Sequence, residues 1–183
     1  MYNLEDLDQD TRRYMLEVFD KEESGGNPYR SKSLTLTGQK HFYGLMKNAI
    51  LDGNETTLAQ SLNYKQFWKH ADLRGRKINI LLSSKKLASV EFNTWYVRGL
   101  SRRLINDKEE YCEIYSAEPA YVPRGDCAAC NGSIIKVRDV YFGHRAKYWP
   151  KSNPSAFSIP TGPDCHYTIR RIKKPECVEN TII

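Results

Sequence analysis

The spacing between apolar residues changes within one stretch of the chain, residues 84–117, which read SKKLASVEFNTWYVRGLSRRLINDKEEYCEIYSA. Over 84–106 apolar side chains recur every three or four positions, which is typical of one side of a helix. Gly99 within it costs about 1 kcal/mol relative to alanine unless another segment packs closely there. Over 111–117 the period is two, which is typical of a strand. This stretch therefore predicts a long helix that begins near Ser84 and leads into a sheet.

Helical patterns also precede this stretch. Asp8 or Asp10 can cap a first helix that ends at the breaker residues 24–28, and a second helix is expected after Thr37. Asn54 can cap a short third helix. The apolar stripe of the second helix has the spacing i, i+3, i+4, i+7, i+8 of one buried helix face; its residues are Phe42, Leu45, Met46, Ala49 and Ile50. Residues 78–82 fit either a strand or a packed loop.

Two further strand patterns follow the long helix, over residues 133–141 and 165–172. Helices followed by strands indicate an α+β domain. We therefore expect a helical region over 1–110 and a subdomain of antiparallel strands over 111–183, together forming one compact unit.

Composition excludes some classes of protein. The chain has 183 residues, of which 40% are hydrophobic, so it can bury the core of one domain. Membrane binding is not expected, because no run approaches the roughly 18 apolar residues of a membrane span. The acidic N-terminus lacks the apolar segment of a secretory signal, which predicts synthesis in a cytoplasm. Without a glycine-rich phosphate loop or a G-x-S-x-G motif, we expect no small-molecule substrate.

Charge is distributed unevenly along the chain. Residues 1–26 hold three basic and eight acidic side chains, whereas the remainder holds 25 basic and 14 acidic ones. An acidic leader before a basic body predicts either a polyanionic partner or a neighbouring protein of matching polarity, and simple solubility is the alternative. The arginines that we expect to contact phosphates lie on the long helix and the last strand: Arg98, Arg102, Arg103, Arg170 and Arg171. A merely solvated charged face is the alternative for these residues.

Cysteine spacing indicates a metal site. Cys127 and Cys130 form a C-x-x-C motif just before a predicted strand, a spacing that lets two thiolates approach one zinc ion. Cys165 is a natural third ligand, and the fourth is His144, or His166 if the backbone bends there. A structural zinc ion would then pin the β-subdomain. A Cys127–Cys165 disulfide and buried free thiols are the alternatives.

The same region resembles the C-terminal part of phage Mu-type minor head proteins. Those proteins carry a C-x-x-C motif, a glycine, a hydrophobic strand, and then a proline-rich approach to a Cys/His pair and an arginine-rich strand. The matching residues are Cys127, Cys130, Gly132, Ile134, Ile135, the stretch 160–166, Arg170 and Arg171. The chain lacks the Cys-Arg-Cys type cluster that usually ends the family.

That resemblance implies a non-enzymatic structural or adaptor component of a virion, in a head, neck or connector position. Its partners would be other virion subunits, which an acidic arm would reach, and packaged DNA. It would be located in the virion after synthesis in the host cytoplasm.

The region is also similar to the HNH nuclease family, at Cys127, Cys130, His144, Asn153, Cys165 and His166. This similarity implies a metal-dependent nuclease with a histidine general base. Asp139, however, is five residues before His144, farther than in that family, and the second C-x-x-C motif is missing. We therefore expect no enzymatic activity; an HNH-like nuclease and a zinc-containing nucleic-acid-binding protein are the alternatives.

Overall fold

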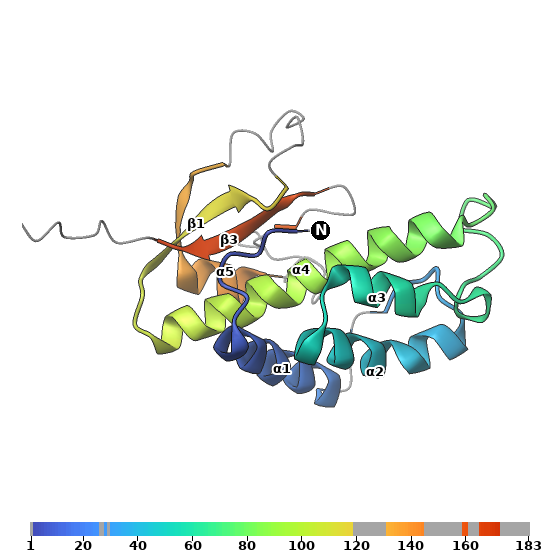
Figure 1. The fold of residues 1–183 in the computed structure, drawn as a ribbon, viewed down its shortest axis with the longest axis horizontal. Helices are drawn as coiled ribbons and strands as arrows, with labels where there is room; N and C mark the ends of the chain where they lie inside the picture. Colours follow the sequence, from blue (N-terminus) through green and yellow to red (C-terminus); the bar gives the residue numbers. More distant parts are fainter. Residues whose placement is uncertain are drawn as a thin grey trace, which may run out of the picture.

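The long helix α4 (Ile80–Asn106) is the axis on which the rest of the chain packs (Figure 1). In the computed structural model, the described residues are 2–25, 28, 30–118, 131–144, 159–160 and 165–172. Three helices pack along one side of α4: α1 (Gln9–Ser24), α2 (Leu36–Asp52) and α3 (Glu55–Leu62). The sheet lies on its other side. No helix within the described ranges is long and apolar enough to cross a membrane.

Side-chain caps start the first three helices. Asp8, one of the two predicted candidates, is the N-cap of α1, and its side chain accepts from the Thr11 N–H. Asn54 is the N-cap of α3, as predicted, and accepts from the N–H groups of Thr56 and Thr57. The second helix begins earlier than expected, because Thr35 is its N-cap and accepts from the Gly38 N–H at 3.1 Å.

The start of α4 also differs from the sequence prediction. Asn79, not Ser84, is its N-cap, and the Asn79 Oδ1 accepts from the Leu82 N–H at 3.0 Å. Residues 80–82 therefore form the first helical turn, and neither the strand nor the loop interpretation holds there. Close packing at Gly99 is confirmed: a Cβ at that position would lie 2.4 Å from Met15 Cγ.

The sheet contains β1 (Tyr111–Ser116), β2 (Ile134–Lys136) and β3 (Tyr167–Arg171), all antiparallel in the order β2-β1-β3. The α+β class is therefore confirmed. The predicted strand over 133–141 is wrong in its second half, which forms the helix α5 (Val137–Gly143). Val137 and Val140 are buried and three positions apart, a spacing that suits a helix and that no strand can place on one face.

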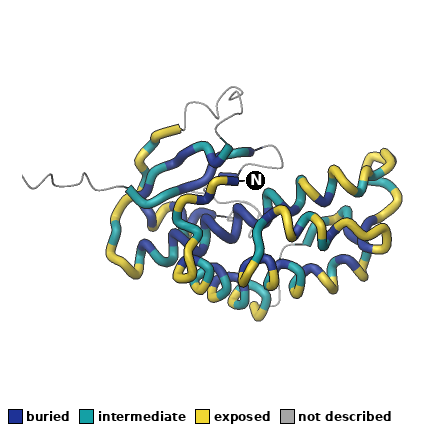
Figure 2. The backbone as a smooth tube through the Cα atoms, viewed as in Figure 1, coloured by how far each residue is buried: buried dark blue, intermediate teal, exposed yellow. Residues whose placement is uncertain are grey.

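One hydrophobic core joins the helices to the sheet. All seven residues over 91–97 of α4 are buried, because helices cover one side of this segment and the sheet covers the other (Figure 2). Tyr2 and Leu4 of the leader also belong to this core. The boundary expected at residue 110 marks a change of secondary structure within a continuous core.

Candidate functional site

The acidic leader packs on the body of its own chain instead of extending as an arm. The Asn3 N–H donates to the Ala117 carbonyl at 2.8 Å, and the Tyr115 hydroxyl donates to the Asn3 carbonyl at 2.8 Å. The Glu5 N–H donates to that same hydroxyl at 2.9 Å. Burial raises the pKa of Tyr115 to about 12, so the phenol keeps its proton at neutral pH. The leader is therefore part of the fold.

The arginines predicted on α4 form ion pairs with the leader and α1. Arg102 Nε lies 3.0 Å from Glu17 Oε1. Arg103 Nη1 lies 2.6 Å from Asp8 Oδ1. These contacts place acidic residues of the first helix directly over the basic side of α4.

Arg98 is held at the junction between the helices and the C-terminal part. Its Nη1 donates to the His144 carbonyl at 3.2 Å, and its Nη2 lies 3.5 Å from Glu22 Oε2. The guanidinium carbon also lies 5.4 Å from the ring centroid of Trp95. This arginine connects α1, α4 and the end of α5.

The arginines predicted on β3 are also paired within the chain. Arg170 lies 2.7 Å from both Glu5 Oε1 and Glu113 Oε1, through its two terminal nitrogens. Arg171 Nη2 lies 2.5 Å from Asp107 Oδ2. Nucleic-acid contact by the five predicted arginines stays a prediction, and phosphates would have to displace these carboxylates.

The predicted metal ligands are only partly described. Cys127 and Cys130 lie outside the described residues, and no group of three metal-ligating side chains forms within the described part of the chain. Cys165 is described and is buried. Because Cys127 lies outside the described residues, the Cys127–Cys165 disulfide stays an alternative to zinc. Zinc remains a prediction.

His144 has a hydrogen bond that suits a metal ligand. It is buried, and its Nε2 donates to the Ile159 carbonyl at 2.7 Å. The proton on Nε2 leaves the lone pair on Nδ1, and zinc-binding histidines commonly have their second nitrogen fixed in this way. The predicted ligand role of His144 would therefore use Nδ1.

A pocket of about 760 Å³ lies between the leader, α3 and the start of α4. His166 and Glu118 line it, and His166 Nδ1 lies 2.5 Å from Glu118 Oε2. Glu55 forms another part of the wall and accepts from the Tyr2 N–H at 2.7 Å. A carboxylate close to an imidazole is an arrangement found where side chains transfer protons.

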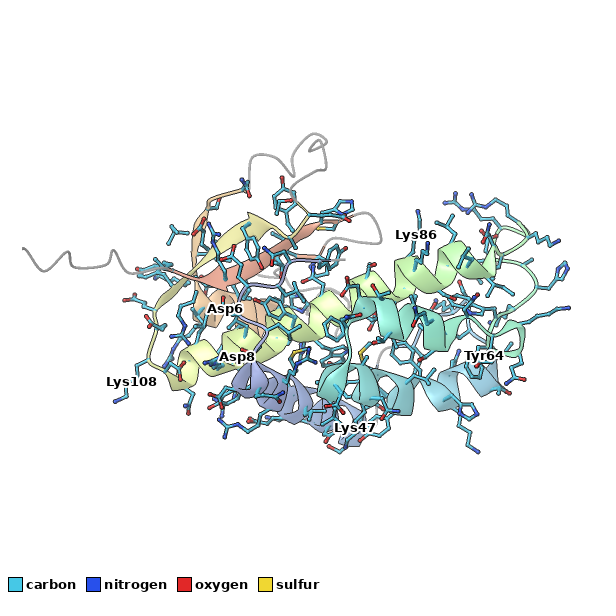
Figure 3. All side chains as sticks on the ribbon, in the orientation of Figure 1. Asp6, Asp8, Lys47, Tyr64, Lys86 and Lys108 are labelled. Carbon is cyan, nitrogen blue, oxygen red and sulfur yellow. The ribbon has the colours of Figure 1, made fainter. Side chains whose placement is uncertain are left out.

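The helical end of the molecule carries a basic surface that the sequence analysis missed. We define the basic end as residues 63–86, which include seven lysines and arginines and one acidic residue, Asp72. The rest of the chain holds 21 basic and 21 acidic residues, so this segment alone accounts for the net charge of +6. Tyr64 and Lys86 mark this end in Figure 3, opposite Lys108. A count of charge in windows along the chain would have found it.

Comparison with known proteins identifies no relative: no family model, no curated protein and no solved structure matches the chain. The function must therefore be argued from the residues and their arrangement.

Proposed function

We propose that this protein is a non-enzymatic structural or adaptor component of a phage-type particle, in a head, neck or connector position. It assembles with other subunits through protein–protein contacts. The sequence resemblance supports the kind of particle, and one structural observation supports the mode of action: large apolar side chains are exposed on and beside the sheet.

Two of these side chains belong to β1 and β2, and the third belongs to α5, which directly follows β2. Glu113 pairs with Ile134 across the two strands, and Tyr111 is two positions before Glu113. Tyr111 and Ile134 therefore lie on the same face, opposite to the buried Cys112. Phe142 of α5 is 69% exposed. Large exposed apolar side chains of this kind act as anchors when a partner covers them.

The internal ion pairs support a preformed surface. Because carboxylates of the leader and α1 hold Arg102, Arg103 and Arg170, the helices and the sheet are connected by charged contacts as well as by the core. A subunit with such connections can bind a partner without ordering a segment first, which lowers the entropic cost of assembly.

The nuclease alternative requires a histidine that reaches a water molecule. His144 is only 6% exposed, and its Nε2 is bonded to the Ile159 carbonyl. His166 lines the pocket beside Glu118 and is the better-placed base. If the chain is an enzyme, we expect His166→Ala to remove its activity.

Incorporation into particles tests the proposal. Particles are purified on a density gradient from a lysate of the organism that encodes the chain, and the chain is quantified by mass spectrometry. We expect it at a fixed ratio to the major particle protein. The double variant Ile134→Ser/Phe142→Ser should lose incorporation, whereas Leu36→Ser, which changes an exposed leucine at the other end, should keep it. Both variants should melt like the wild type. A wild-type chain that sediments apart from particles would contradict the proposal.

A further inference from the structure

We infer that the basic end is a binding surface for single-stranded nucleic acid. This inference goes beyond the proposed adaptor function and does not depend on it, since the apolar residues beside the sheet and the basic end belong to different parts of the molecule (Figure 3). The surface also differs from the five arginines that the sequence predicted for this purpose.

The charge of the basic end faces solvent. Lys65, Lys69, Lys77 and Lys85 are all exposed, and they come from η1 (Lys65–Phe67), from the following loop and from α4. Positive side chains that gather in one region raise the local potential and attract polyanions. Each phosphate contact releases counterions, so binding by this surface must weaken as salt rises.

The one acidic residue of the basic end is used to build its loop. Asp72 Oδ1 accepts from the N–H groups of Arg74 and Arg76, at 2.9 and 3.0 Å. These hydrogen bonds and the ion pair with Arg76 lower the pKa of Asp72, so the carboxylate stays charged and holds the turn closed. Gly75 completes the turn with a φ of 77°, a conformation that favours glycine. The loop thus presents Arg74 and Lys77 on a hydrogen-bonded support.

Aromatic rings lie among these cations. The Tyr64 ring is exposed and has its centroid 5.6 Å from that of Phe67. The exposed ring of His41, from α2, lies 5.3 Å from the same phenylalanine. Trp68 anchors the segment, because it is buried and its Nε1 donates to the Leu62 carbonyl at 2.8 Å. Exposed rings beside lysines form a platform on which bases of a single strand stack.

The aromatic rings favour a nucleic acid over an anionic lipid surface. Leu73, Leu81 and Leu82 are exposed at the same end and would suit either partner. A lipid surface needs apolar groups that insert together, whereas bases need flat rings flanked by cations. The exposed Tyr64 ring, next in sequence to Lys65, provides the second arrangement. Replacing Tyr64 should therefore weaken binding of a nucleic acid but not binding of a lipid surface.

Fluorescence anisotropy with a labelled oligothymidine of about 20 nucleotides measures this binding. We expect the wild-type chain to bind, with an affinity that falls about tenfold or more between about 50 and 200 mM NaCl. Lys65→Glu/Lys77→Glu should weaken binding about tenfold. The matched control, Lys108→Glu/Lys136→Glu, makes the same change in net charge at the sheet end and should leave affinity within about twofold. Tyr64→Ala should weaken binding of the single strand more than binding of a duplex of the same length.

Other results would overturn the inference. Absence of binding would do so. An equal loss of affinity in both double variants would do so as well, because it would indicate that net charge alone determines binding. The protein could instead bind vesicles of anionic phospholipid as tightly as the oligonucleotide, with an affinity that Tyr64→Ala leaves unchanged. That result would indicate a lipid surface as the partner. Thermal unfolding of each variant shows that loss of binding is not loss of fold. Particle incorporation is a separate readout, so failure of this inference leaves the adaptor proposal standing.

Discussion

Arg103 of α4 and Asp8 at the start of α1 form the contact that joins the basic body to the acidic leader. Arg103 Nη1 lies 2.6 Å from one carboxylate oxygen of Asp8 and 2.7 Å from the other. The Asp8 Oδ1 also accepts from the Thr11 N–H at 2.9 Å, which caps α1. One carboxylate therefore both starts a helix and neutralises an arginine.

The two functions of Asp8 can be separated by substitution. Asp8→Ala removes the cap and the ion pair, and we expect it to cost about 1–2 kcal/mol of unfolding free energy. Asp8→Asn keeps a good N-cap and should cost less than about 1 kcal/mol, because the carboxylate is more than half exposed and solvent screens the pair. Urea denaturation measures both values. Equal costs for the two variants would contradict the dual function.

The same residue predicts a dependence of stability on pH. Partial burial raises the pKa of Asp8, but hydrogen bonds from Arg103 and the Thr11 N–H outweigh it, and the net pKa is lower than usual. A carboxyl group with a lowered folded-state pKa stabilises the fold at pH values above its unfolded pKa of about 3.9, and this stabilisation is lost as the pH falls through the folded-state value. The wild type should therefore be more stable than Asp8→Asn at neutral pH, and the difference should shrink below about pH 4. A difference independent of pH would contradict this.

Gly99 lies where α4 packs closely against α1. A Cβ there would lie 2.7 Å from the backbone nitrogen of Met15, so alanine must push the helices apart. We expect Gly99→Ala to cost about 1–3 kcal/mol, as overpacking does. Gly44 is the matched control, because it is an exposed glycine of α2 where an added Cβ would meet no atom within 4 Å. Gly44→Ala should stabilise by about 0.5–1 kcal/mol. Thermal denaturation that finds both substitutions stabilising would contradict the close contact.

Zinc content tests the cysteine site. Protein purified without chelator should contain one zinc ion per chain by mass spectrometry, and Cys130→Ser should lose both the metal and thermal stability. His144→Ala should lose the metal as well if Nδ1 is the fourth ligand. Cys112, which is buried in β1, provides the control, and Cys112→Ala should retain zinc. Metal-free wild-type protein would leave a disulfide or free thiols as the state of the cysteines and weaken both family resemblances.

Local signals predicted much of the fold. Asp8 and Asn54 were identifiable as caps because their short polar side chains satisfy the N–H groups of a first turn. The strand β1 followed from alternation. By contrast, the apolar run at residues 80–82 and the segment over Val137–Gly143 are too short for their periodicity to distinguish helix from strand.

The arrangement of charge could not be predicted from local patterns. Arg170 pairs with Glu5, which is 165 positions away, so only the folded chain brings them together. The sequence therefore favoured these arginines as phosphate ligands, although in the folded chain they form ion pairs with carboxylates. Conversely, the charge of the basic end can be counted from the sequence alone. Its exposure, and the position of the Tyr64 ring beside it, depend on how α2, η1 and α4 meet.

The arginines of α4 and β3 pair with carboxylates, and the basic end is the surface proposed to bind nucleic acid. The most direct test of this arrangement is a lysine footprint of the bound complex. The protein is acetylated briefly with and without the oligothymidine, and the modification of each lysine is quantified by mass spectrometry. We expect protection of Lys65, Lys69 and Lys77, with Lys108 and Lys136 unchanged. Protection at the sheet end, or equal protection of all five lysines, would contradict this expectation.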